Sequence, residues 1–178
     1  MSILPEILRI DSISGDYIKF VDWKKKLADR IDTSKIQMGQ YLFQWAAKDT
    51  TVIVIIYSIE NSNDPMGYMY LNKIKDGYMV ISLGVKKEHR GKNISMLLYD
   101  YVISKTTLYS DYQQSPAARK LWVKLFYKYT VVGYDIPSGN YFEVAPNSTG
   151  TELESLDPKY ELYVSNTPVA EDTILAVL

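Results

Sequence analysis

The sequence of 178 residues contains no cysteine and only one histidine, His89. The absence of cysteine excludes disulfide bonds, a thiol nucleophile and thiolate metal ligands within this chain. A single histidine cannot supply the two imidazoles of an HExxH-type zinc site. No aspartate-rich loop has the spacing of a calcium or magnesium site, so we expect no metal.

An excess of charge of one sign is also absent. The sequence has 20 basic and 21 acidic residues, which gives a net charge of −1. This balance argues against broad electrostatic binding to nucleic acid or to an anionic membrane. No window approaches the length of a membrane span, and the first residues lack the pattern of a signal peptide. We therefore expect a cytoplasmic protein without membrane contact.

The first half of the chain combines a helical pattern with strand patterns. Apolar residues recur at three- and four-residue steps between Phe20 and Ile31, which predicts a helix. Four segments have the composition of strands joined by short polar turns: 40–47, 51–59, 68–74 and 78–85. The second of these is apolar on both faces, which predicts a central strand. The Asn, Asp, Pro and Gly content of segment 61–67 predicts a loop.

The second half contains two predicted helices and several short strands. An apolar stripe from Ile94 to Val102 predicts one helix, and Ser115 followed by Pro116 predicts the start of another. Strands are expected at 107–114, 130–136, 141–145 and 159–165, with a loop at 146–158. The apolar last ten residues have no assigned state. These patterns predict a single α+β domain over 1–178 with a mostly antiparallel sheet, in which 136–178 is an extended strand and loop region.

A short basic turn separates the predicted strand at 78–85 from the helix that starts at Ile94. The amino terminus of a helix carries unpaired amide groups and a partial positive charge, so it attracts phosphate. Gly91 permits a left-handed backbone, and Asn93 tolerates one better than most residues. The basic residues in and near the turn are Lys86, Lys87, Arg90 and Lys92, and we expect His89 to flank them in solvent. These residues fit a phosphate site and equally fit a solvated turn.

The segment "LGVKKEHRGKNISMLLYDYVI" resembles the acyl-CoA-binding motif of the GCN5-related N-acetyltransferase (GNAT) family. That motif has Arg or Gln, two residues, Gly, one residue, and then Gly or Ala. Arg90 takes the first place, Asn93 stands where the first glycine is usual, and Ser95 stands where glycine or alanine is usual. The predicted order of elements over most of 15–165 is also similar to that of the family. Four later residues stand in matching places: Ala118, Leu121, Gly133 and Tyr134.

The resemblance implies a GNAT-like fold, with a mixed, mostly antiparallel central sheet flanked by helices. It implies direct transfer of an acetyl or other acyl group from acetyl-CoA to an amine acceptor. Pantetheine would contact the main chain of the strand before the turn, where Gly84 is expected to mark a bulge, and pyrophosphate would lie on the amides of the turn. The implied acyl-CoA-binding residues are Leu83, Gly84, Val85, Arg90, Gly91, Lys92, Asn93, Ile94 and Ser95.

Such a transfer needs a base for the amine and an acid for the leaving thiolate. The family often supplies a tyrosine acid at the place that Trp122 takes here, and an indole cannot act as an acid. The candidates for the acid are Tyr112, Tyr127 and Tyr129, and the candidates for the base are Asp111 and Glu60. Each also fits an ordinary surface role, and water can carry the proton in some such sites.

Two classes of function therefore stay open. The first is an N-acyltransferase that acts on a small amine, a protein amino group or an aminoacyl group. The acidic net charge argues against an acceptor carried on tRNA. The second is a protein that keeps the fold without catalysis and serves as an interaction or structural module, since Asn93, Ser95 and Trp122 depart from the family pattern. A homodimer is a fold-level expectation.

Overall fold

The computed structural model of the chain describes residue 27, residue 30 and residues 34–112, 114–160 and 173–178. The chain divides into two compact units. The first comprises Met1–Asn72 and Ile81–Tyr101, and the second comprises Lys73–Val80 and Val102–Leu178. The helix predicted near the amino terminus and the strand predicted at 159–165 lie mostly outside the described residues.

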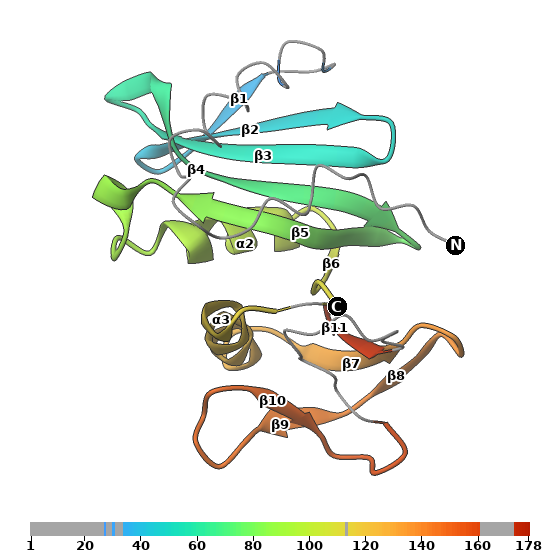
Figure 1. The fold of residues 1–178 in the computed structure, drawn as a ribbon. Coiled ribbons are helices and arrows are strands. Elements are labelled where there is room, and N and C mark those ends of the chain that lie inside the picture. The colour runs from blue at the N-terminus through green and yellow to red at the C-terminus, as the bar shows by residue number, and fades with distance from the viewer. Residues whose placement is uncertain (1–26, 28–29, 31–33, 113, 161–172) are drawn as a thin grey trace. The chain divides into compact units, whose positions relative to one another are not determined.

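The first unit is built on an antiparallel meander. Its strands pair in chain order, as Figure 1 shows: β1 (Lys35–Met38), β2 (Tyr41–Lys48), β3 (Thr51–Ser58) and β4 (Asn61–Ile74). Every residue of β3 from Val52 to Tyr57 is buried, and β3 is paired along both edges. A strand that is covered on both faces has no polar side, so the predicted central strand is confirmed.

The prediction of a loop at 61–67 is wrong, because these residues belong to β4. The register between β3 and β4 shifts on both sides of Tyr57, and Tyr57 faces Pro65 there. A proline lacks the N–H group that a regular ladder requires and is accommodated at such irregularities. The turn-forming residues therefore lie in an irregular stretch of strand, and the turn itself is at Ile59 and Glu60.

Two apolar layers hold the first unit together. On one side, Ile53, Ile55, Tyr57 and Tyr68 form a buried cluster. Elsewhere in the unit, the ring of Phe43 on β2 stacks on Tyr101 of α2 (Ile94–Ile103), with ring centroids 4.5 Å apart and planes 12° from parallel. This contact fixes α2 against β2. The helix predicted after the basic turn is thus confirmed.

The second unit contains a mixed sheet, to which β5 (Gly77–Val85) contributes its first residues, up to Val80. The strand order is β5, β6 (Thr107–Tyr109), β11 (Thr173–Val177), β7 (Val131–Asp135) and β8 (Asn140–Phe142). The pair β5–β6 is parallel, and the remaining pairs are antiparallel. This arrangement confirms the expected α+β class with a mixed, mostly antiparallel sheet. The order of strand, basic turn, helix, strand and helix is the GNAT-like order expected from the sequence.

The structure corrects two predicted strands of this unit and assigns a state to the end of the chain. The strand predicted at 107–114 ends at Tyr109, because the Ser110 hydroxyl replaces a backbone group and accepts a hydrogen bond from the Leu175 amide at 3.0 Å. The strand predicted at 141–145 is divided at Glu143 between β8 and β9 (Val144–Pro146). The apolar end of the chain is β11, all five residues of which are buried.

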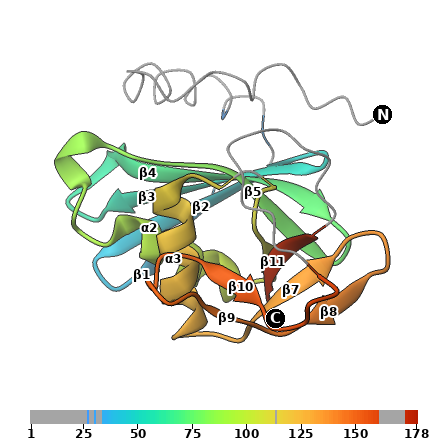
Figure 2. The ribbon, with the colours of Figure 1, turned by 60° about the horizontal axis from the view of Figure 1, so that its bottom comes forward.

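The helix α3 (Pro116–Phe126) begins as the sequence predicts. The Ser115 hydroxyl oxygen accepts a hydrogen bond from the Ala118 amide at 3.2 Å, and Pro116 occupies the first turn. The helix buries Trp122, Val123 and Leu125 and contacts the strand β10 (Leu153–Ser155), as Figure 2 shows. No helix in the described part of the chain is long and apolar enough to cross a membrane.

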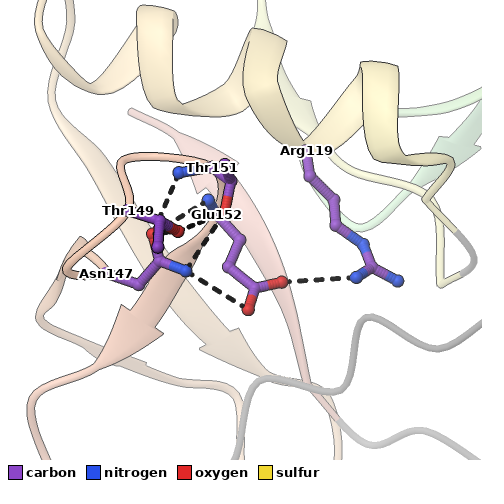
Figure 3. Close-up of polar contacts among 5 residues, drawn as sticks. All are labelled: Arg119, Asn147, Thr149, Thr151 and Glu152. Carbon is purple, nitrogen blue, oxygen red and sulfur yellow. Dashed lines mark hydrogen bonds and ion pairs between the residues drawn. The ribbon is translucent and has the colours of Figure 1, made fainter.

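The loop predicted at 146–158 contains a further strand, β10 (Leu153–Ser155), which pairs with β9. Asn147 organises the turn between these strands, as Figure 3 shows. Its side-chain oxygen accepts from the Thr151 amide at 2.9 Å, and its amide nitrogen donates to the Thr151 hydroxyl at 3.2 Å. Glu152 reaches Arg119 of α3 at 3.3 Å. These groups bond to one another, so we assign them a structural role.

Candidate functional site

The basic turn connects β5 to α2 in the first unit. After Val85 the chain makes one turn of 3₁₀ helix, η2 (Lys87–His89), and then an exposed loop from Arg90 to Asn93. The His89 amide donates to the Lys86 carbonyl at 2.9 Å, which closes this turn. The strand-loop-helix element expected from the sequence is therefore present.

Two residues of this loop have left-handed backbone. The φ angle is +77° at Gly91 and +61° at Asn93. A side chain costs about 1–2 kcal/mol in this region, and glycine and asparagine bear that cost most easily. Asn93 thus takes the conformation that glycine would take at the same place. A Cβ atom built at Gly91 would meet nothing within 4 Å, so the loop backbone is open to a ligand.

The first turn of α2 follows Asn93 directly. The Leu97 amide donates to the Asn93 carbonyl at 3.2 Å, so the amides of Ile94, Ser95 and Met96 precede the first helical hydrogen bond. The Ile94 side chain is buried and fixes the turn, whereas Ser95 is partly exposed. These amides carry the partial positive charge of the helix, which favours an anion at this point.

The four cations near the turn have different roles. Lys86 is paired with the Asp64 carboxylate, and its amide donates to the Met66 carbonyl at 3.0 Å, so it joins the turn to β4. Arg90 donates from Nε to the Val85 carbonyl at 3.3 Å, which draws its side chain back along the loop. Lys87 and Lys92 are exposed. The sequence did not predict the ion pair between Lys86 and Asp64, because these residues are 22 positions apart.

His89 is less exposed than the sequence suggested. It is partly buried, and its Nδ1 atom is buried without a hydrogen-bond partner among the described residues. Its ring therefore packs on the protein side of the turn, not in open solvent.

The residues expected to line pantetheine, Leu83, Gly84 and Val85, form the partly exposed end of β5. Gly84 is needed there for a packing reason. A Cβ atom at this position would lie 2.5 Å from the ring of Tyr68, and one at Gly67 would lie 3.0 Å from the Gly84 carbonyl oxygen. The close approach of β4 and β5 at Gly67 and Gly84 thus leaves no room for a side chain at either position.

The candidate catalytic residues belong to the second unit. Asp111 and Tyr112 follow β6 and are partly exposed, and burial followed by the Asp111 charge raises the pKa of Tyr112. Tyr129 follows α3, with the Lys128 ammonium 5.4 Å from its ring centroid. Trp122 is only 1% exposed, so it is a core residue. Among the described residues, no group of three or more His, Asp or Glu side chains is placed to hold a metal ion.

A polar cluster that the sequence did not predict surrounds the loop between β4 and β5. It consists of Lys75, Asp76, Tyr109, Tyr134 and Tyr141, all within the second unit. The sequence signals only a turn at "KDG" and an abundance of tyrosine. These five residues come from segments up to 66 positions apart, as Lys75 and Tyr141 are, so their proximity depends on the sheet order.

The structure is similar to that of a Bacteroides thetaiotaomicron protein provisionally named as a GNAT-family acetyltransferase. The match has 9% sequence identity and a TM-score of 0.41 and covers 93% of this chain and 83% of that chain. No protein-family model and no curated protein matches the sequence. At this identity and TM-score the likeness supports no inference about activity, so the function has to be inferred from the residues of the chain itself.

Proposed function

We propose that the chain is an N-acyltransferase that binds acetyl-CoA or a related thioester and transfers its acyl group to an amine. The observation that carries the proposal is the left-handed backbone at Gly91 and Asn93 immediately before α2. This conformation leaves the loop backbone open where the helix presents its unpaired amides. A diphosphate group matches both the partial charge of the helix and the nearby cations Arg90 and Lys92.

The departures from the family motif are compatible with this binding. Asn93 supplies the backbone conformation that a glycine would supply, and Ser95 is small and partly exposed. Neither residue adds a negative charge to the loop. The end of β5 from Leu83 to Val85 offers main-chain groups beside the loop for the pantetheine arm, which is the role that the resemblance implies.

In the proposed reaction the amine nitrogen attacks the thioester carbonyl, the C–N bond forms and the C–S bond breaks. One proton leaves the nitrogen and one is taken up by the thiolate. We assign the first transfer to Asp111 or water, and the second to Tyr112 or Tyr129. A tyrosine phenol is already protonated at neutral pH, which an acid requires, and burial raises the pKa of Tyr112 further.

The alternative is a binding module that has lost catalysis. It is favoured by Trp122, which is buried in the core at the place where the family often has its tyrosine acid. Such a protein would bind CoA or a partner without turning over a thioester.

The absence of cysteine provides a direct test, because every thiol released in the assay must come from CoA. Wild type is mixed with acetyl-CoA and a panel of small amines and amino-terminal peptides, and free thiol is measured. The proposal predicts amine-dependent thiol release by wild type and its loss in Gly91→Glu. The matched control is Gly39→Glu, since Gly39 also has left-handed backbone (φ +59°) with nothing within 4 Å of a Cβ atom. CoA binding without thiol release for any amine would favour the binding module.

A further inference from the structure

The loop between β4 and β5 places a cation against two tyrosine rings. The Nζ atom of Lys75 lies 4.7 Å from the ring centroid of Tyr134 and 5.2 Å from that of Tyr141. The centroids of these two rings are 5.1 Å apart, with planes inclined by 39°. An ammonium group within about 6 Å of a ring face is attracted by the negative charge of the π-system. Two rings of this kind form two walls of a cation site.

A fixed carboxylate completes this site. The Tyr109 hydroxyl donates to Asp76 at 2.8 Å and lies 3.1 Å from the Tyr141 hydroxyl. Tyr109 is fully buried, so its hydroxyl holds Asp76 and Tyr141 in place from the core side. The negative charge of Asp76 and the ring faces of Tyr134 and Tyr141 thus act on the same cation, and we call these three residues the tyrosine cage.

The backbone at Lys75 shows that this position is unusual for a lysine. Its φ angle is +49°, in the left-handed region that glycine and asparagine occupy more easily. A strained position that carries a long charged side chain suggests that the side chain has a role. The attraction between the Lys75 ammonium and the cage offsets part of the strain. The contact with Tyr134 raises the pKa of Lys75 most, although burial opposes it in part.

The cage is open on its outer side. Lys75 and Asp76 are exposed, and Tyr141 is 39% exposed. Lys75 can therefore leave the cage by rotation about its own side-chain bonds. No movement of a strand is needed to empty the site.

We propose that the tyrosine cage is a binding site for the quaternary ammonium group of a small molecule, and that Lys75 occupies it as an internal competitor. A quaternary ammonium is larger and more weakly hydrated than the lysine ammonium, so it gains more from two ring faces. The ligand binds only while Lys75 is outside the cage. Its apparent affinity is therefore reduced in proportion to the time that Lys75 spends inside.

The test uses the full chain and tetramethylammonium chloride as the probe, with sodium chloride at equal concentration as the salt control. The ring signals of Tyr134 and Tyr141 are followed by NMR in wild type and in Lys75→Asn. Asparagine removes the ammonium and suits the left-handed backbone. We expect saturable shifts at both rings, with an affinity in Lys75→Asn at least about fivefold higher than in wild type.

Two further variants separate competition from a general change in the protein. Lys75→Arg keeps a cation on the loop and should remain close to wild type. Lys75→Asn combined with Tyr141→Leu removes one wall and should lose the saturable shift at Tyr134. Equal affinities in wild type and Lys75→Asn would overturn the competition, and binding that persists without Tyr141, or no saturable shift in Lys75→Asn, would overturn the site.

Discussion

At the scale of single residues, Asn93 shows how a chain can depart from a glycine motif and keep its backbone. The φ angle at this position is +61°, which glycine adopts without strain. Asparagine tolerates this angle better than most other residues. The sequence alone predicted this tolerance from the residue type. It did not predict the roles of Lys86 and Asp64, because an ion pair between distant residues depends on which strands become neighbours.

Substitution of Asn93 tests the backbone argument. Asn93→Ala should lower the free energy of unfolding by about 1–2 kcal/mol, since alanine bears the cost of the left-handed backbone at this position. Asn93→Gly should stay within a few tenths of a kcal/mol of wild type. Urea unfolding of the three proteins measures the difference. Equal losses in the alanine and glycine variants would contradict the assigned conformation.

Tyr57 gives a pH dependence with a defined sign. Burial raises the pKa of Tyr57 from 10.0 to about 12, and its hydroxyl donates to Gln44 at 2.7 Å. The folded state therefore favours the neutral phenol. The stability that comes from this preference is complete below pH 10 and is lost as the pH rises from 10 to about 12.

The variant Tyr57→Phe isolates this effect, because the other tyrosines titrate in both proteins. Below pH 10 wild type should be more stable by about 1 kcal/mol, the value of a typical hydrogen bond. Between pH 10 and 12 this advantage should shrink. Urea unfolding at pH 8, 10, 11 and 12 measures it, and an advantage that stays constant over this range would show that Tyr57 does not titrate as described.

At the scale of elements, the parallel pairing of β5 with β6 depends on Gly77. Gly77 faces Thr107 in the register, and a Cβ atom there would lie 2.2 Å from the Thr107 carbonyl oxygen. A backbone oxygen cannot rotate away as a side chain can. Glycine is therefore required at the point where β5 and β6 begin to pair.

Gly77→Ala should consequently lower the free energy of unfolding by at least about 2 kcal/mol, in the upper range of overpacking costs. Gly39→Ala is the control, because it adds only the strain of left-handed backbone, about 1 kcal/mol. Thermal and urea unfolding of both variants provide the comparison. If Gly77→Ala were no less stable than Gly39→Ala, the β5–β6 contact would have to be looser than the structure indicates.

Elements whose ends are marked by residues within the segment could be predicted from the sequence. Elements that depend on pairing with distant strands could not. Ser115 and Pro116 mark the start of α3 within the sequence itself. Pro65 indicates a loop until its position opposite Tyr57 in an irregular strand pair is known. The sequence of β11 shows only that this segment is apolar. Its strand conformation depends on pairing with β6 on one side and β7 on the other.

At the scale of the whole molecule, the balanced charge directs attention to local sites. With a net charge of −1, the chain is not expected to attract an anion by a broad field, so anion binding has to come from the amides and cations of one loop. The order of β5, this loop, α2, β6 and α3 could be predicted from the sequence. The tyrosine cage could not, because it joins residues from three separate segments of the second unit.

The central claim is that the loop from Arg90 to Ser95 holds the diphosphate of CoA. Calorimetric titration of wild type, Gly91→Glu and Gly39→Glu with CoA tests it most directly. We predict binding by wild type and Gly39→Glu, and affinity at least about tenfold weaker in Gly91→Glu, where a carboxylate stands at the phosphate position. No binding by wild type, or an equal loss in both glutamate variants, would contradict the account.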